Sequence, residues 1–361
     1  MKTALFIGRF APPHKGHINA IIKMLNTYDK LVICLGSCYE IGSNRHPLLA
    51  VFREKMLLLS IALEGGDLSK LKIVYLQDYN NFNDWLNDVL EVAKLNNVTH
   101  FITGNKEDII DIIKSKNLNL PFVFVNPEKD SSFPYHATDL RNAFTNGDYN
   151  KFCEIASFGT QMLLGSVDEL SSIRPSLENS GREFYKGRQT FDLVFTIQEK
   201  FVEQNTNKSA HFNTYVLCGK RPKTKRDYPN YLGVVGDEIL KYESPINACI
   251  RVLKEKTGIE ATLNSNLTEP AIITLNTDKG KMLAYLRFLQ LYNDKDLAGS
   301  MGGSSQAFHI NLTCSHTIFN NILKNSPFKF VLVEDALTQG LAYQQTDMLK
   351  DAINKLTHYA E

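Results

Sequence analysis

The sequence predicts an α/β chain of two domains, in which an N-terminal doubly wound parallel sheet precedes an α+β domain. Its 361 residues are more than one ordinary core accommodates and suit two domains. Over residues 3–126, short apolar runs alternate with segments of helical spacing, which is typical of a parallel sheet with helices on both faces. After about residue 157, strand-like segments dominate and convincing helical patterns become rare.

The first domain is expected to contain five strands and the helices that join them. The apolar runs are short, and several are rich in β-branched residues, as buried strands are. Their bounds are 4–7, 31–35, 73–76, 100–103 and 122–125, with helical spacing around 18–25 and 85–93. Ligands bind such sheets at the carboxyl ends of the strands, so polar residues that follow a strand are the functional candidates.

A polar stretch at 171–190, rich in Pro, Gly and Ser turn signals, predicts a linker between domains 1–170 and 191–361. In the second domain the composition indicates a mixed sheet with few helices. Strands are expected at 191–197, 212–218, 271–275, 282–289 and 330–333, and helices at 245–257 and 343–356.

Composition excludes several classes of function. Lys+Arg number 40 and Asp+Glu 39, and this net charge of +1 argues against sequence-independent nucleic-acid binding. No apolar stretch reaches the ~18–20 residues that span a bilayer, and the N-terminus lacks a signal-peptide pattern. The 6 cysteines form no CxxC pair and favour reduced, buried thiols. We therefore expect a cytoplasmic protein without nucleic-acid or membrane partners.

The stretch G-R-F-A-P-P-H-K-G-H, which begins at Gly8, directly follows the first predicted strand. His14 and His17 are three apart and share one helix face, at an N-terminus whose free N–H groups attract anions. Gly8 permits a sharp turn, Gly16 leaves room for a phosphate, and Arg9 adds a fixed cation. The motif predicts chemistry at phosphate, in which the imidazoles stabilise charge on the phosphoryl oxygens and on leaving pyrophosphate.

This stretch resembles the signature of the nucleotidyltransferase superfamily, which includes nicotinamide-mononucleotide (NMN) adenylyltransferases and cytidylyltransferases. The resemblance implies a Rossmann-like fold and a second signature, I-S-x-T-x-I-R, after the last strand of the sheet. The segment H-A-T-D-L-R matches it at Thr138 and Arg141, whereas His136 and Ala137 occupy the serine positions. One hydroxyl contact to the phosphates is therefore expected to be absent.

The resemblance also assigns site residues. The implied catalytic residues are His14, His17 and Arg141. The implied ATP-binding residues are Gly8, Arg9, Phe10, Gly16, Gly104, Asn105, Thr138 and Arg141.

Two further stretches resemble the archaeal type of NMN adenylyltransferase. N-R-H-P at 44–47, together with Arg53, is similar to a segment whose arginines contact substrate phosphates. D-Y-N-N-F-N-D-W at 78–85 is similar to an element that stacks an aromatic ring on nicotinamide and binds its carboxamide through asparagines. The implied NMN-binding residues are Arg45, Arg53, Asn81, Asn83 and Trp85.

The implied reaction joins NMN and ATP to give NAD and pyrophosphate. The NMN phosphate is already ionised at pH 7, so catalysis requires positioning and charge stabilisation rather than a general base. Mg²⁺ is expected with ATP, held partly by phosphate oxygens.

The second domain contains a segment, 236–259, that resembles the Nudix box of ADP-ribose pyrophosphatases. Glu243, Arg251 and Glu255 match the box, whereas its two other acidic positions carry Val252 and Lys256. The box gathers carboxylates to hold Mg²⁺ or Mn²⁺ against a diphosphate, and a lysine there repels a divalent cation. We expect a Nudix-like fold with weak or lost ADP-ribose hydrolysis and with Glu255 as a weak metal ligand.

Several alternatives stay open on the sequence. The chain could be fully bifunctional and hydrolyse ADP-ribose to AMP and ribose 5-phosphate. It could instead be a cytidylyltransferase or a pantetheine-phosphate adenylyltransferase with a nucleotide-sensing second domain. Lys256 could also hold a diphosphate without cleaving it. A homo-oligomer is possible, and the spacing does not choose between NMN and nicotinate mononucleotide.

Overall fold

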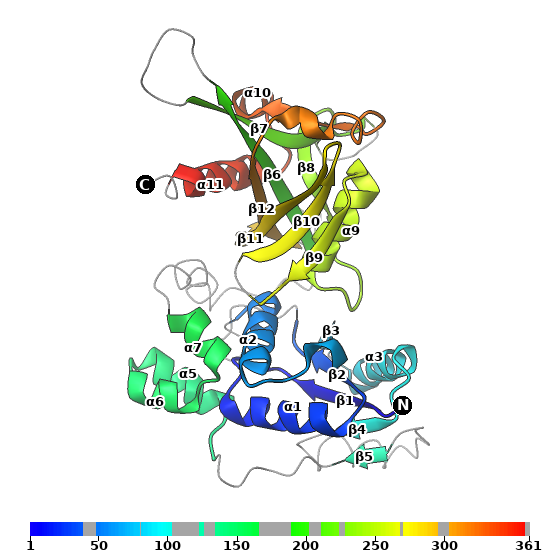
Figure 1. Ribbon diagram of the computed structural model, residues 1–361, viewed down its shortest axis with the longest axis vertical. Helices are drawn as coiled ribbons and strands as arrows, with labels where there is room; N and C mark the ends of the chain where they lie inside the picture. The colour runs from blue at the N-terminus through cyan, green and yellow to red at the C-terminus, as the bar shows by residue number, and fades with distance from the viewer. Residues whose placement is uncertain are drawn as a thin grey trace. The chain divides into compact units, whose positions relative to one another are not determined.

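The computed structural model describes residues 1–38, 48–79, 81–102, 123–125, 134–165, 189–201, 211–223, 228–267, 270–294 and 303–357. The chain divides into two compact units, Met1–Phe184 (unit 1) and Tyr185–Glu361 (unit 2), drawn in Figure 1. The predicted linker at 171–190 lies outside the described residues except for Gln189 and Thr190. Those two residues begin strand β6 (Gln189–Phe201) and so belong to the second sheet.

Unit 1 contains a five-stranded parallel sheet with the strand order β3-β2-β1-β4-β5. Its strands are β1 (Thr3–Gly8), β2 (Lys30–Leu35), β3 (Leu71–Tyr75), β4 (His100–Ile102) and β5 (Val123–Val125). Its helices are α1 (Lys15–Thr27), α2 (Ala50–Leu63), η1 (Leu68–Lys70), α3 (Phe82–Leu95), α5 (Ala137–Thr145), α6 (Tyr149–Ile155) and α7 (Phe158–Gly165). The strand order reverses between β1 and β4, and ligands bind such sheets in the crevice beside this switch point.

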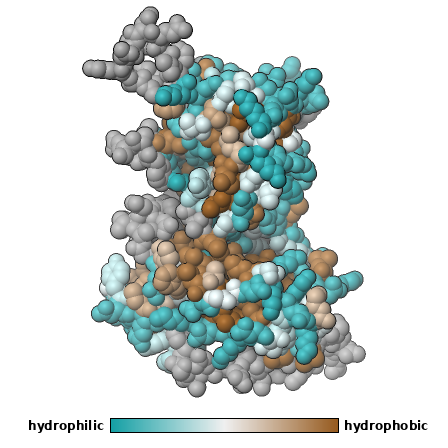
Figure 2. Space-filling model, viewed as in Figure 1, coloured by the Kyte–Doolittle hydropathy of each residue, from teal (hydrophilic) through white to brown (hydrophobic). Residues whose placement is uncertain are grey.

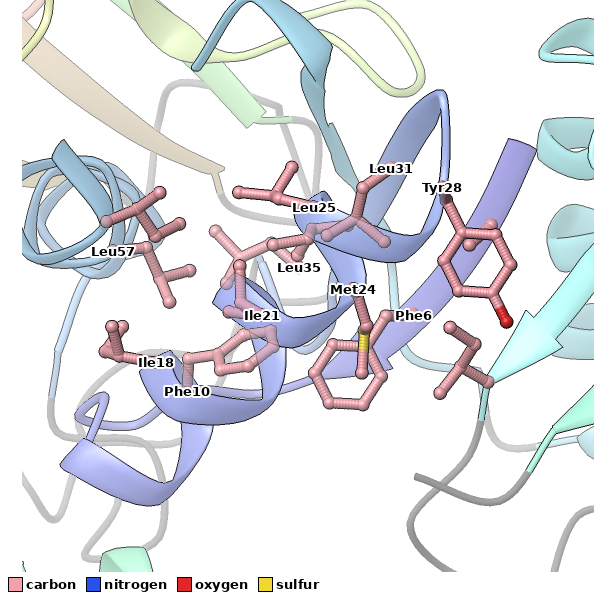
Figure 3. Close-up of a cluster of buried hydrophobic side chains, with 14 of the residues drawn as sticks. Phe6, Phe10, Ile18, Ile21, Met24, Leu25, Tyr28, Leu31, Leu35 and Leu57 are labelled. Carbon is pink, nitrogen blue, oxygen red and sulfur yellow. The ribbon is translucent and has the colours of Figure 1, made fainter. Parts of the chain in front are cut away.

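Strand residues alternate between two buried faces, which is why the strands read as continuous apolar runs. Ala4 and Phe6 of β1 belong to a core cluster with Ile21 of α1 and Leu57 of α2. Figure 3 shows this cluster, with the apolar side chains of α1 directed at those of the strands. Leu5, on the opposite face of β1, is equally buried. Helices therefore cover both faces, and the predicted doubly wound α/β fold is confirmed.

Unit 2 is built on an eight-stranded mixed sheet of order β13-β7-β8-β6-β12-β11-β10-β9, in which only β6 and β12 pair in parallel. Beyond β6, its strands are β7 (His211–Lys220), β8 (Leu232–Glu238), β9 (Ala261–Ser265), β10 (Ala271–Thr277), β11 (Gly280–Asp294), β12 (Gly303–Thr313) and β13 (Phe328–Leu332). Its helices are α9 (Pro245–Thr257), η4 (His316–Phe319), α10 (Val333–Gln339) and α11 (Gln345–Thr357). The predicted α+β class is confirmed.

The prediction for unit 2 missed five elements. It contained no strand at β8, β9 or β12 and no helix at η4 or α10. The last predicted strand, 330–333, was displaced along the chain: β13 begins two residues earlier, at Phe328, and Val333 begins α10.

Surface and thiol properties fit the sequence expectations only in part. Among the described helices, none combines the length and the apolar character needed to cross a membrane.

Four of the free cysteines are buried, whereas Cys153 is exposed; the buried ones are Cys34, Cys38, Cys218 and Cys249. Figure 2 shows hydrophobic residues gathered over unit 1 in the region of α2 and α7, where Leu63 and Phe158 are among the exposed side chains.

Local signals define α9, the helix of the box-like segment. The Ser244 side chain accepts a hydrogen bond from the Asn247 N–H (3.2 Å), and Pro245 occupies the first turn. Gly258 ends the helix at a φ of 81°, a left-handed conformation that favours glycine. Both ends match the sequence prediction.

We predict that Ser244→Ala destabilises α9 by about 1 kcal/mol, because one helix N–H loses its acceptor. Hydrogen exchange of peptides that cover 245–257 in the full chain measures this as faster exchange of the helix amides. Ser244→Asp, which keeps an acceptor, is the control and should exchange like the native chain. Equal protection in all three proteins would contradict the capping role.

Candidate active site

The candidate site begins where β1 ends and α1 starts. His14 is the N-cap of α1, and its Nδ1 accepts the His17 backbone N–H (3.3 Å), while the His17 Nδ1 accepts the His14 backbone N–H (3.3 Å). The two rings stack with their centroids 3.6 Å apart and 25° between their planes. The predicted pair of imidazoles on one face is thus a reciprocal capping box made of histidines.

This capping fixes the chemistry of both rings. A ring nitrogen that accepts a backbone N–H carries no proton, so each neutral ring holds its proton on Nε2. Burial, followed by the charge of His136, lowers the pKa of His14 to about 4. Burial also holds the pKa of His17 well below its usual value, and the charges of His14 and His136 add to this effect. At neutral pH the pair therefore offers two neutral Nε2–H donors.

Phe10 and Gly8 pack behind the histidines. The Phe10 ring is buried in the core and meets the His17 ring edge-on at 4.9 Å. It lies against Gly8, where an added Cβ would come within 2.5 Å of the ring. The side chain of Phe10 is therefore not placed to bind ATP, and Gly8 serves to make room for that ring. Gly16 lies in the first turn of α1, and Arg9 is exposed.

Arg53 lies on α2 and is enclosed by backbone carbonyls. It is fully buried and donates to the carbonyls of Leu48 (3.1 Å), Gly36 (2.9 Å), Ser37 (2.8 Å) and Arg9. These bonds direct the guanidinium at the backbone after β1 and β2, whereas the resemblance implied a contact with a substrate phosphate. Arg53 joins the carboxyl ends of two neighbouring strands.

The second predicted signature lies at the start of α5. Arg141 donates to the Ala11 carbonyl (2.7 Å) and to the Thr138 hydroxyl (3.1 Å), so it connects α5 to the loop that precedes His14. His136 is the N-cap of α5, and its backbone N–H donates to Asp139 (2.7 Å). The two signatures, more than a hundred residues apart in sequence, thus meet at one place.

Three residues that the sequence reasoning missed hold the same loop from the other side. Ser157 and Thr160 donate their hydroxyls to the Pro13 carbonyl at 3.2 and 2.8 Å, and the Lys15 ammonium donates to the Cys153 carbonyl (2.9 Å). No local motif marks Ser157 and Thr160, because their role depends on the packing of the segment around α7 against the loop, whereas Lys15 lies within the G-R-F-A-P-P-H-K-G-H stretch itself.

The predicted nicotinamide residues lie at the start of α3. Asn81 is the N-cap, and its Oδ1 accepts the Asn83 backbone N–H (2.8 Å), so this oxygen is engaged by the helix. Trp85 is half-buried, and its ring lies 5.5 Å from that of Phe82. Arg45, Gly104 and Asn105 lie outside the described residues.

In unit 2 the predicted box residues form an ion-pair network. Arg251 bonds both oxygens of Glu243 (2.8 and 2.9 Å) and reaches Glu255 (3.0 Å), and the bond to Glu243 raises the pKa of Arg251. Lys256 pairs with Asp237 (2.8 Å) and donates to the Gly236 carbonyl. Burial alone would raise the pKa of Asp237, but the hydrogen bond from Lys256 holds it below its usual value.

A buried carboxylate lies beneath this network. Asp192 accepts from Ser305 (2.5 Å) and from Gln345 (2.6 Å), and burial raises its pKa. A Cβ at Gly236 would come within 2.6 Å of the Asp192 carboxylate, so only glycine fits there. In the part of the chain that the structure describes, no group of three His, Cys, Asp or Glu side chains is arranged to hold a metal ion.

The sequence comparisons concern unit 1. Residues 5–143 match the family model "Cytidylyltransferase-like". The nicotinamide-nucleotide adenylyltransferase of Pyrobaculum neutrophilum is 37% identical over 105 residues, which cover 29% of this chain and 58% of that enzyme. The enzyme of the same name from Archaeoglobus fulgidus is 25% identical over 187 residues, which cover 50% of this chain and 99% of that enzyme.

Among solved structures, a bifunctional NMN adenylyltransferase/ADP ribose pyrophosphatase from Francisella tularensis aligns with 87% of this chain and 86% of its own. The sequence identity is 20% and the TM-score is 0.36.

We predict that the neutral state of His14 makes unit 1 less stable in mild acid. Between pH ~6.5 and about 4, the unfolded chain binds a proton at this residue that the folded chain does not. The free energy of unfolding therefore decreases as the pH is lowered through that window. His14→Asn keeps a capping side chain without a titrating ring. Between pH 6.5 and 5 this variant should lose about 2 kcal/mol less unfolding free energy than the native chain.

Urea unfolding followed by the fluorescence of Trp85, the single tryptophan of the chain, reports on unit 1. His100→Asn, at the amino end of β4, is the matched control. If His14→Asn and the native chain lose equal stability over this interval, the histidine pair is not kept neutral by folding.

Proposed function

Starting from the match of residues 5–143 to the cytidylyltransferase-like family, we propose that unit 1 transfers the adenylyl group of ATP to NMN and releases pyrophosphate. The observation that carries this proposal is the stacked pair of neutral imidazoles at the start of α1, connected to α5 by the bond from Arg141 to Ala11. A triphosphate is a suitable ligand for this site, because the start of α1 offers helix N–H groups, the two imidazoles offer Nε2–H donors, and Arg141 offers a guanidinium. The aligned region covers only 58% of the Pyrobaculum relative, so substrates and activity are inferences.

In the proposed reaction an NMN phosphate oxygen attacks the α-phosphorus of ATP. A new phosphorus–oxygen bond forms as the bond to the β-phosphate bridging oxygen breaks, and pyrophosphate takes the electron pair. No proton needs to move, because both the nucleophile and the leaving group are anions near neutral pH. His14 and His17 would donate Nε2–H bonds to oxygens that gain negative charge, and their capping bonds keep them oriented beforehand.

Mg²⁺ suits this site as a companion of ATP. The described residues contain no group of three acidic, histidine or cysteine side chains arranged for a metal ion, so they offer no protein cage. An ion held mainly by phosphate oxygens and water agrees with the usual binding of Mg²⁺ to nucleotides. Arg9 and Arg141 would share the remaining negative charge.

The sheet offers a second subsite at a suitable spacing. The start of α3 follows the carboxyl end of β3. In the sheet, β3 is two strands away from β1, so the ends of these two strands are about 10 Å apart. This separation suits a substrate whose phosphate lies near α1 and whose base reaches the aromatic side chain of Trp85. We propose NMN for this position, with its pyridinium ring against the indole.

The test is pyrophosphate release from MgATP and NMN, followed with the native chain and with His17→Ala. We expect kcat to fall by about 10²–10³, because one donor to the reacting phosphates is lost. His100→Ala, at the opposite edge of the sheet, is the control and should keep the native rate. Parallel reactions with nicotinate mononucleotide and with CTP identify the substrate pair. Native turnover by His17→Ala would overturn the proposed site.

For unit 2 we propose a Nudix-like domain that has lost metal-dependent hydrolysis of ADP-ribose. The Lys256 ammonium lies between the Gly236 carbonyl and the Asp237 carboxylate, oxygens of the kind that bind a divalent cation. Arg251 engages Glu243 and Glu255, and the third acidic position of the box is the buried, apolar Val252. An ammonium and a divalent ion ~4 Å apart repel each other strongly at the effective ε of ~20 typical of such sites.

Lys256→Glu is expected to create a Mn²⁺ site, because it removes this cation and places a second carboxylate beside Glu255. Titration with Mn²⁺, followed by electron paramagnetic resonance of the free ion, should give one additional bound ion per chain. Lys254→Glu, on the same helix but paired with Glu260 at the surface, is the matched control. ADP-ribose cleavage to AMP by the native chain with Mg²⁺ or Mn²⁺ would contradict the proposed loss.

A further inference from the structure

We propose that Ser157 and Thr160 are positioning residues for the imidazole of His17. They act through the peptide unit that joins Pro13 to His14. The Thr160 hydroxyl donates to the carbonyl of this unit (2.8 Å), and the N–H of the same unit donates to the His17 Nδ1 (3.3 Å). The inference rests on the adenylyl transfer proposed for this site, because it concerns an imidazole that would donate to the reacting phosphates.

The two hydroxyls are buried and arranged around one carbonyl oxygen. Ser157 is 1% exposed and Thr160 is fully buried, and their oxygens lie 2.9 Å apart. Ser157 donates to the Pro13 carbonyl at 3.2 Å, so Thr160, with the shorter bond, is the principal donor. The backbone of Ala156 also forms a bridge with that of His14. Together these contacts fix the orientation of the peptide unit before α1.

A close approach between α2 and the start of α7 holds the hydroxyls in place. The Ser60 hydroxyl on α2 lies 2.9 Å from that of Ser157, and it accepts the Gly159 backbone N–H (2.8 Å). An added Cβ at Gly159 would come within 2.3 Å of the Met56 carbonyl, so a larger residue would push α7 away from α2. The position of the donors is therefore set by helix packing outside the histidine motif.

The peptide unit transmits the effect, because hydrogen bonds at its two ends polarise each other. Donors at the carbonyl draw electron density from the amide, which makes its N–H a stronger donor. The His14 N–H then holds the His17 Nδ1 more firmly as an acceptor, and the ring proton stays on Nε2. Burial keeps the pKa of His17 well below its usual value, so a phosphate would meet this neutral tautomer at neutral pH.

A purely structural role is the alternative, since buried hydroxyls commonly satisfy a buried carbonyl. The two roles differ in what a variant changes. A structural role affects the melting temperature and leaves the folded protein with a native imidazole. A positioning role changes the tautomer of His17 and the turnover of protein that is still folded.

The test variant is Thr160→Val, which keeps the branched shape of the side chain and removes its hydroxyl. Long-range proton–nitrogen correlation NMR of the full chain reports which ring nitrogen of His17 carries the proton, and His17→Ala assigns the signal. We expect a single Nε2–H tautomer in the native chain and a mixture in Thr160→Val. With MgATP and NMN, kcat should fall about tenfold at unchanged KM, because a donor to the transition state loses its orientation. Thr160→Ser, which restores the hydroxyl, should recover both the tautomer and the rate.

Thr3→Val is the matched control, because it makes the same change at a buried threonine at the amino end of β1. Its tautomer and kcat should be native. Ser157→Ala removes the longer bond, should show both changes to a smaller degree, and decides the question if Thr160→Val does not fold.

A native His17 tautomer or a native kcat in folded Thr160→Val overturns the proposal, even if the melting temperature falls, and leaves the proposed function intact. The same holds for Ser157→Ala where that variant decides. If the native chain releases no pyrophosphate from MgATP and NMN, the proposed function fails and the positioning role fails with it.

Discussion

The candidate active site depends on one constraint: the same two side chains that complete the N-terminus of α1 are the ones that face the proposed substrate. The Nδ1 atoms of His14 and His17 each accept a backbone N–H at the start of α1. This capping therefore fixes the tautomer of both rings. A serine cap would satisfy the helix equally well but would not deliver a stacked pair of Nε2–H donors. The bonds that complete the start of α1 are therefore the same bonds that orient the two imidazoles before a substrate binds.

A buried cation organises the strand ends behind this pair. Burying a charge is costly unless polar partners replace water, and Arg53 obtains four carbonyl partners. Only arginine presents enough donors in a planar fork to reach the backbone after two adjacent strands, whereas lysine would reach fewer of these oxygens. The carbonyls of Arg9 and Gly36 are held in place, and with them the turn that leads into the histidine motif. The positive charge also remains inside the sheet edge, where it favours anions in the crevice.

The sequence predicted what is encoded locally and missed what depends on tertiary packing. The capped ends of α9 and the start of α1 were predictable, because each signal lies within a few residues of its effect. The burial of Arg53 was not, since an arginine on a helix is usually exposed and only the fold surrounds it with carbonyls. Strand β8 was missed because Gly233 and Gly236 weaken strand propensity, yet Gly236 is required by the Asp192 carboxylate that a Cβ would strike.

In the second unit a lysine lies among oxygen atoms of the kind that bind a divalent cation. The Gly236 carbonyl and the Asp237 carboxylate converge on Lys256 as hard oxygen ligands would converge on a divalent ion. A tethered ammonium satisfies these oxygens without a metal, and it connects the end of β8 to the last turn of α9. It carries half the charge of Mg²⁺, and an ammonium does not activate a bound water as a metal does. If Lys256 takes the place of a metal ion, as proposed above, the contacts of the box segment are kept while metal-dependent hydrolysis is lost. For this reason we propose the chemistry of this chain for unit 1.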